Sequence, residues 1–144
     1  MKLDELHTLW EKESILDFSQ PDKIIREIPL AHGRWWRFLT DEKQRYIVMK
    51  QEFDKLRHLK YQWYVGHMDD GTRIQLKWDP QPLRLIKSEV EDYIAVDPEI
   101  ALLNGKLEVQ KMKLEFIADC IKSISNRTFA VKNHLEWLRF SNGS

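Results

Sequence analysis

The 144-residue chain contains little of what several functional classes require. Its single cysteine, Cys120, excludes an internal disulfide, and its five glycines form no phosphate-cradling loop. No apolar run reaches the length of a membrane span or of a signal peptide. We therefore expect a protein without a membrane segment that works in a reducing compartment, the cytoplasm.

The chain also lacks an excess of charge, because 23 basic residues balance 23 acidic ones. A net charge of zero excludes the general basic coat found on many nucleic-acid-binding proteins. The charges nevertheless alternate in blocks. Residues 1–33 carry seven acidic and four basic side chains, and residues 69–99 carry eight acidic and four basic ones. The other two blocks are basic: residues 34–68 carry four acidic and eight basic side chains, and residues 100–144 carry four acidic and seven basic ones. A basic segment can thus face a phosphate backbone while acidic segments face basic partners.

No pattern typical of an active site or a metal site occurs. Asp69 and Asp70 are explained by a polar turn, and Cys120 lies on an apolar helical stripe, where a buried small side chain is expected. Metal-ligand spacing is absent among Cys120 and the five histidines, which are His7, His32, His58, His67 and His134. We predict that the protein is not an enzyme and has no metal and no cofactor.

Helical periodicity, positive charge and aromatic side chains coincide between Lys43 and Gly66. Apolar residues at alternating spacings of three and four, broken only by Lys60, form a stripe that faces a partner: Tyr46, Met49, Phe53, Leu56 and Trp63. A separate line with seven-residue spacing leads from cations to an aromatic ring: Lys43, Lys50, Arg57 and Tyr64. Gly66 fits an αL C-cap that ends this helix.

Cations followed by aromatic rings are typical of surfaces that bind single-stranded nucleic acid. We therefore expect such a site at Lys50, Lys55, Arg57, Lys60, Tyr61, Trp63 and Tyr64. The alternative is that the basic face is only solvated and the aromatic residues fill a core. The protein would then be an oligomeric helical adaptor without direct nucleic-acid binding. A second cluster of cations and tryptophans at 34–37 is more typical of a core.

The first part of the chain predicts two helices. Amphipathic spacing places one from Leu3 to about Glu13, and a second begins near residue 22 and runs in register towards Gly66. Pro29 and Gly33 favour a kink or a restart between about 28 and 34, and residues 40–41 offer another break. One long helix is also compatible with the pattern.

Residues 67–97 predict an insertion rather than a long helix. After a turn at 69–71, apolar and polar residues alternate through Trp78, which predicts a strand. Residues 83–86 could pair with it in a small β-hairpin spanning 73–86. A capping box at Ser88 then opens a short helix.

A long helix follows, with Asp97 as its N-cap and Pro98 in its first turn. Its apolar positions from Ile100 to Ile124 form a coiled-coil-like seam that is broken only by Gln110. The last helix, 128–140, carries apolar residues on more than one face. We predict that subunits meet at Leu107, Gln110, Leu114, Ile117, Ile121, Ile124, Phe129 and Trp137.

These elements predict a single domain over residues 1–144 with a mainly α fold. Long helices in 22–66 and 98–140 would form an antiparallel helical core, and 67–97 would be a turn or β-hairpin insertion. The apolar seam and the last helix indicate a homo-oligomer.

Two stretches resemble the signatures of a known family. Residues 60–66, KYQWYVG, match a Lys/Arg-x-x-aromatic-Tyr-x-Gly motif. Residues 121–123 and 126–133, together with Trp137 and Phe140, look like a carboxy-terminal signature. On these residues the chain resembles the UvsY-like recombination mediators of phages, over most of its length.

The resemblance implies a ring-like homo-oligomer, a hexamer or heptamer, that acts in the host cytoplasm. Such a protein binds single-stranded DNA and helps a RecA-like recombinase to displace the single-strand-binding protein. The family's two DNA-binding basic residues match His58 and Lys60. His58 departs from the pattern because it is mostly neutral near pH 7, although Arg57 beside it supplies a charge. The zero net charge is a second departure and implies weaker, more salt-sensitive binding.

Overall fold

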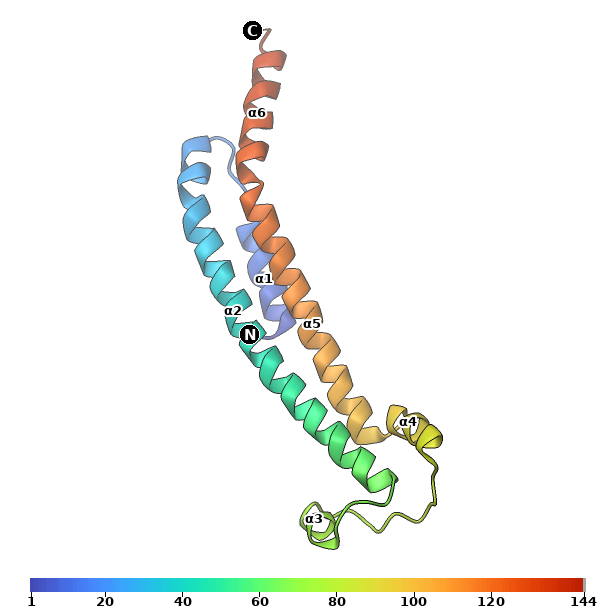
Figure 1. Cartoon of the computed structure of the whole chain (residues 1–144). Helices are drawn as coiled ribbons and strands as arrows, with labels where there is room; N and C mark the ends of the chain where they lie inside the picture. Colours follow the sequence, from blue (N-terminus) through green and yellow to red (C-terminus); the bar gives the residue numbers. More distant parts are fainter. Residues whose placement is uncertain (144) are drawn as a thin grey trace. The chain divides into compact units, whose positions relative to one another are not determined.

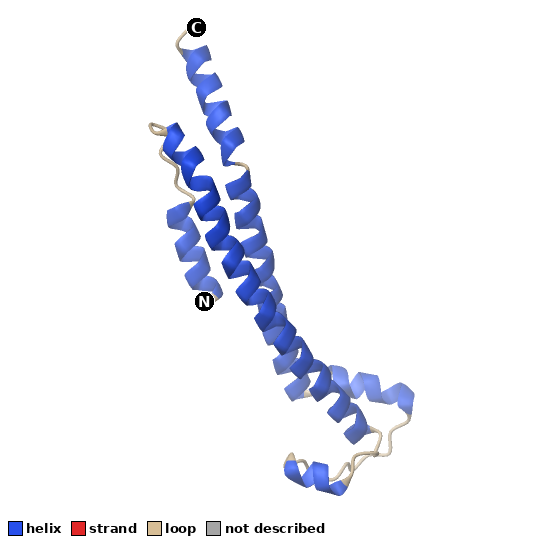
Figure 2. Ribbon diagram, turned by 60° about the vertical axis from the view of Figure 1, so that its left-hand side comes forward, coloured by secondary structure: helices blue, strands red, loops and turns tan. Residues whose placement is uncertain are grey.

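The protein is described by a computed structural model over residues 1–143, which contain helices and connecting segments but no strand. Figures 1 and 2 show this all-helical architecture. The helices are α1 (Leu3–Glu13), α2 (Pro21–Tyr64), α3 (Asp70–Gln75), α4 (Lys87–Ala95), α5 (Pro98–Ser125) and α6 (Arg127–Ser141).

The predicted β-hairpin over 73–86 is wrong, because α3 occupies the start of that segment. Asp69 caps α3, and its carboxylate accepts from the Thr72 backbone N–H at 2.9 Å and from the Thr72 hydroxyl at 2.7 Å. Beyond α3 the chain is irregular up to α4. Pro80 and Pro82 lack the N–H groups that a strand ladder needs. The helix cap and the prolines therefore outweigh a short alternation of apolar and polar residues.

Helix α2 runs without interruption from Pro21 to Tyr64, so it does not restart between 28 and 34 or break at 40–41. Pro29 cannot donate to the carbonyl of Ile25. Both residues lie on an exposed side of the helix, where water can bind that carbonyl. After α2, Gly66 has a φ of 77°, as expected for an αL C-cap.

Contacts divide the chain into two units. Unit 1 comprises residues 1–43 together with the chain from Lys111 onward, and unit 2 comprises residues 44–110. Helices α2 and α5 each contribute to both units.

Unit 1 has a core built around Trp35. In Figures 1 and 2, α1 lies beside α2 and α5, which run antiparallel. The Trp35 ring meets Trp10 and Phe38 edge-on, at 5.3 and 5.2 Å between ring centroids, and its Nε1 donates to Glu13. The other buried residues of this core are Leu6, Ala31, Leu39, Ile117, Cys120, Ile121 and Ile124.

Unit 2 has its own core, in which α4 and the start of α5 cover the end of α2. Val90, Ile94 and Ile100 are buried against partly buried side chains of α2, among them Phe53 and Leu56. The apolar stripe predicted on α2 therefore faces elements of its own chain.

The seam predicted along α5 is also turned largely towards the chain itself. Six seam residues have 8% or less of their surface exposed, namely Ile100, Leu107, Gln110, Ile117, Ile121 and Ile124. Leu114 packs against the unit 1 core. On α6, by contrast, Phe129 and Trp137 are exposed. Of the residues predicted to join subunits, these two present most of their surface to solvent.

Ile117→Ala tests this assignment of the seam to the chain's own core. The substitution leaves a cavity at a fully buried position, so we expect a loss of about 2–5 kcal/mol in the free energy of unfolding. Urea denaturation at fixed protein concentration measures it, and light scattering should give an unchanged molar mass. Val109→Ala, at an exposed position of the same helix, should lose less than about 0.5 kcal/mol. A small loss of stability with a changed mass would instead place Ile117 between subunits.

Candidate nucleic-acid interface

The basic residue of the 60–66 motif, Lys60, is buried, with 7% of its surface exposed. Its Nζ lies 3.2 Å from Asp97 Oδ2 and 3.3 Å from Glu99 Oε1. The same ammonium group lies 4.3 Å from the ring centroid of Trp78 and 5.8 Å from that of Trp63. Lys60 is therefore already paired and shielded from solvent, so it does not present its charge to a phosphate.

Tyr64 belongs to the same network. Its hydroxyl donates to Asp97 Oδ2 at 2.8 Å, and burial, reinforced by this hydrogen bond, raises the pKa of Tyr64. Burial alone would raise the pKa of Asp97, but hydrogen bonds from Tyr64, the Ile100 N–H and Lys60 outweigh it and lower that pKa. Asp97 is thus ionised beside a neutral tyrosine and a charged lysine.

We call Lys60, Tyr64, Trp78, Asp97 and Glu99 the Lys60 cluster. Asp97 also caps α5, because its Oδ1 accepts from the backbone N–H of Glu99 at 3.0 Å and of Ile100 at 3.2 Å. The cluster joins the end of α2, the segment after α3 and the start of α5 within unit 2.

The other aromatic residues of the motif also have partners in the chain. Trp63 Nε1 donates to the Asp79 carbonyl at 2.8 Å, and its ring meets those of Tyr64 and Trp78 edge-on. Tyr61 packs against the unit 2 core. Tyr61, Trp63 and Tyr64, expected to stack on bases, therefore hold unit 2 together.

Four predicted residues remain accessible on α2. Lys55 and His58 are exposed, and Lys50 is exposed and forms a surface ion pair with Asp54, 3.0 Å away. Arg57 pairs with Glu91 of α4, and the two side chains are 42% and 56% exposed. Surface ion pairs contribute little to stability, so phosphates can take the place of these carboxylates.

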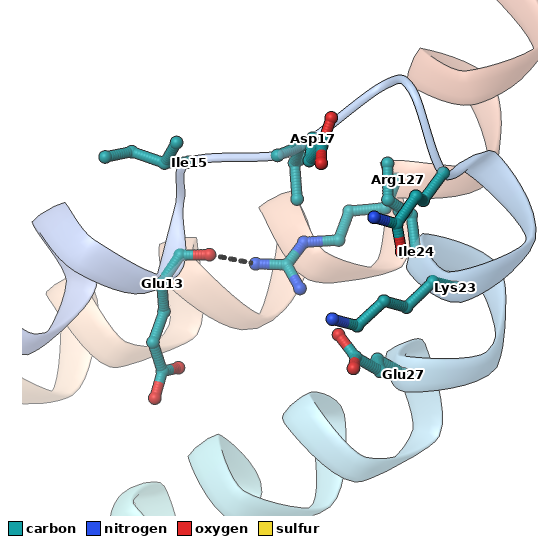
Figure 3. A pocket seen from close by; sticks show the side chains of 9 residues that line it. Glu13, Ile15, Asp17, Lys23, Ile24, Glu27 and Arg127 are labelled. Atoms are coloured by element: carbon teal, nitrogen blue, oxygen red, sulfur yellow. Dashed lines mark hydrogen bonds between the residues drawn. The ribbon is translucent and has the colours of Figure 1, made fainter.

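Arg127 of unit 1 is a second buried cation that is not available to DNA. It donates to the backbone carbonyl of Glu13 at 2.9 Å and so ties the start of α6 to the end of α1 (Figure 3). The neighbouring pocket, of about 180 Å³, also carries Asp17, Lys23 and Glu27. Three carboxylates against two cations make this pocket unfavourable for a phosphate.

Residues 1–143 contain no group of three or more His, Cys, Asp or Glu side chains that could hold a metal ion. Over the same residues, no helix is both long and apolar enough to cross a membrane.

Sequence reasoning did not identify the partners of Lys60. The sequence predicts Trp78 in a strand and Asp97 as a helix cap, and no pattern links either residue, or Glu99, to Lys60. The available signal was Lys60 itself, the one charged position in an apolar stripe, because a buried ammonium group needs carboxylates nearby. The periodicity could not show which carboxylates these are.

A family model described as "Recombination, repair and ssDNA binding protein UvsY" matches residues 9–144. The chain belongs to the UvsY family. The resemblance found in the sequence is thereby confirmed, and so are recombination, repair and single-stranded DNA binding as the function of this family member. The alternative of a helical adaptor without nucleic-acid binding is not supported.

Crystal structures of the bacteriophage T4 recombination mediator protein UvsY share this fold. One lattice form (type II) has a TM-score of 0.83 at 18% identity and covers 100% of this chain and 99% of that chain. Another (type IV) has a TM-score of 0.84 at 16% identity, covering 97% and 99%. A third (type I) has a TM-score of 0.80 at 17% identity, covering 95% and 98%. No curated protein matches the chain.

Within the UvsY family motif, Lys60 would be expected to contact DNA, whereas its contacts here are structural. We predict that Lys60→Met lowers the free energy of unfolding by about 3 kcal/mol, because the buried Asp97 loses its cation. Urea denaturation at pH 7 measures the change. Lys55→Met is the matched control, and at this exposed position we expect a loss below about 0.5 kcal/mol. Equal losses in the two variants would contradict the structural role of Lys60.

Proposed function

We propose that this UvsY family member loads a RecA-like recombinase onto single-stranded DNA covered by single-strand-binding protein. Family membership supports this role, and the structurally similar T4 protein is a recombination mediator. The observation that carries the proposal is the accessible group of basic residues on α2 within unit 2. No catalytic step is required of the chain in this role.

The proposed DNA-binding face consists of Lys50, Lys55, Arg57 and His58. Lysine and arginine side chains of this kind contact phosphates and carry no sequence information, so binding should tolerate any base sequence. In this proposal Lys60, Tyr61, Trp63 and Tyr64 support the face by fixing the end of α2, and they do not contact DNA themselves. Nearby carboxylates and the zero net charge favour weak binding per subunit.

Helix α6 supplies the proposed subunit contact. Its first half is anchored in unit 1, where the His134 ring stacks on Phe18 at 4.7 Å between centroids. In Figures 1 and 2 the end of α6 extends past the turn between α1 and α2, with no other helix beside it. Trp137 and Phe140 on this end are 61% and 84% exposed. Large apolar side chains grouped in this way favour contact with another subunit.

We therefore propose a homo-oligomer in which α6 contributes Phe129, Trp137 and Phe140 to the contact. By analogy with the family it is a closed ring of six or seven copies in the host cytoplasm. A closed ring repeats the DNA-binding face, so weak sites add up to useful avidity on one strand. The family match over 9–144 also supports a single UvsY-like domain.

The DNA-binding face is tested by the double variant Lys50→Ala/Lys55→Ala. For single strands, each lost phosphate contact should lower the slope of log affinity against log salt by about 0.7, so two contacts should lower it by about 1.4. Fluorescence anisotropy with a labelled oligo-dT over a range of KCl concentrations measures both affinity and slope. Lys12→Ala on α1 removes a cation outside this face; it serves as the control and should leave both unchanged. An unaltered affinity and slope in the double variant would exclude this face.

The subunit contact is tested by Trp137→Glu/Phe140→Glu. Carboxylates cannot be buried cheaply in an apolar contact, so the molar mass measured by light scattering should fall towards that of one chain. Lys132→Glu changes an exposed charge on the same helix and should leave the mass unchanged. A double variant that keeps the parent's mass would show that α6 does not join subunits.

A further inference from the structure

Unit 2 contains an open groove of about 440 Å³ beside Arg57, lined by α2, α4 and α5. The Lys60 cluster does not contribute to it. Its apolar lining comes from Phe53, Ile94 and Ile100. The groove stays open because three lining positions carry a methyl group or no side chain: Ala95, Ala101 and Gly105.

Polar groups lie only at a few positions of this groove. Arg57 of α2 and Glu91 of α4 form an ion pair in which both side chains keep much of their surface exposed. Such a pair is weak, so a phosphate can replace Glu91 on the planar guanidinium group, whose fork of donors matches phosphate oxygens. Asn104 of α5 adds an amide with both donor and acceptor groups, which can pair with the polar edge of a base.

The groove is continuous with the proposed DNA-binding face. Phe53 lines it, and Lys50 Nζ lies 5.1 Å from the centroid of the Phe53 ring. Arg57 belongs to both the face and the groove. A strand whose phosphates follow Lys50 and Arg57 therefore passes the opening of an apolar slot that has an aromatic wall.

We propose that this groove is a nucleobase site, in which one base of the bound single strand inserts against Phe53 while Arg57 holds the adjacent phosphate. This inference rests on the proposed function. The combination of an aromatic wall, an amide and flanking cations is suited to a nucleotide, since bases stack on aromatic rings and phosphates need positive charge. An apolar peptide side chain would make no use of the two cations.

Gly105 provides a direct test. A Cβ added at this position meets no atom within 4 Å, and the residue is helical, so a larger side chain can enter the groove without backbone strain. Gly105→Leu fills the groove, whereas Gly105→Ala leaves it open and raises helix propensity, which makes it the matched control. Ala101→Leu is a second filling variant from the same helix, and circular dichroism verifies that each variant is folded.

The probes are a labelled oligo-dT and an abasic deoxyribose-phosphate strand of equal length, measured by anisotropy at fixed salt. For the parent we expect about tenfold tighter binding of oligo-dT, the size of effect that stacking of one base on an aromatic ring produces. Gly105→Leu and Ala101→Leu should lose this preference while keeping the affinity for the abasic strand and the salt slope. Gly105→Ala should behave like the parent.

Other outcomes overturn the inference. If the filling variants keep the preference for oligo-dT, the groove takes no base, while loss of binding in Lys50→Ala/Lys55→Ala would still support the proposed function. If the filling variants change the molar mass, the groove is a contact between copies of the chain. If the parent binds neither strand, the proposed function itself fails.

Discussion

The buried ion pair of Lys60 and Asp97 is the interaction on which unit 2 depends. Each charge would be costly to bury alone, and each is stable here because the other lies 3.2 Å away. Asp97 additionally caps α5 and accepts from Tyr64, while Lys60 lies against the ring of Trp78. One ion pair therefore fixes three segments that are distant in sequence.

The sequence motif at 60–66 suggests that the same residues support the fold and contact DNA. In the proposed function these two roles belong to different residues of α2. The buried members of the motif determine where α2 ends and how the following segment returns to α5. The accessible basic residues lie earlier on the same helix, and two of them, Lys50 and Arg57, each have a carboxylate nearby. If DNA binds at the proposed face, phosphates must replace these carboxylates, and such binding is sensitive to salt.

The sequence was most informative where a local signal determines a local structure. The caps at Asp97 and Gly66 and the apolar spacing of 3–13 gave helix ends close to those observed. It was least informative at 73–86, where the alternation of apolar and polar residues predicted a strand but the cap at Asp69 starts the helix α3 instead. Periodicity also shows that a stripe is buried without showing what buries it. The seam of α5 therefore suggested contacts between subunits, although most of it packs inside the chain.

The same limit applies to Lys60, whose partners lie 37 and 39 residues away and leave no periodic trace in the sequence. Long-range pairing of this kind depends on the tertiary fold, and a family motif alone does not reveal it. The motif correctly identified the family, but the presence of a basic residue did not establish that the residue is accessible.

The packing of the single cysteine has a practical consequence for following this protein on DNA. Cys120 is buried in the unit 1 core, and burial, reinforced by the charges of Asp119 and Glu13, raises the pKa of its thiol to about 12. A thiol that is both covered and protonated reacts slowly with maleimides. One cysteine introduced at an exposed position would therefore carry a fluorophore selectively, and the native residue could stay in place.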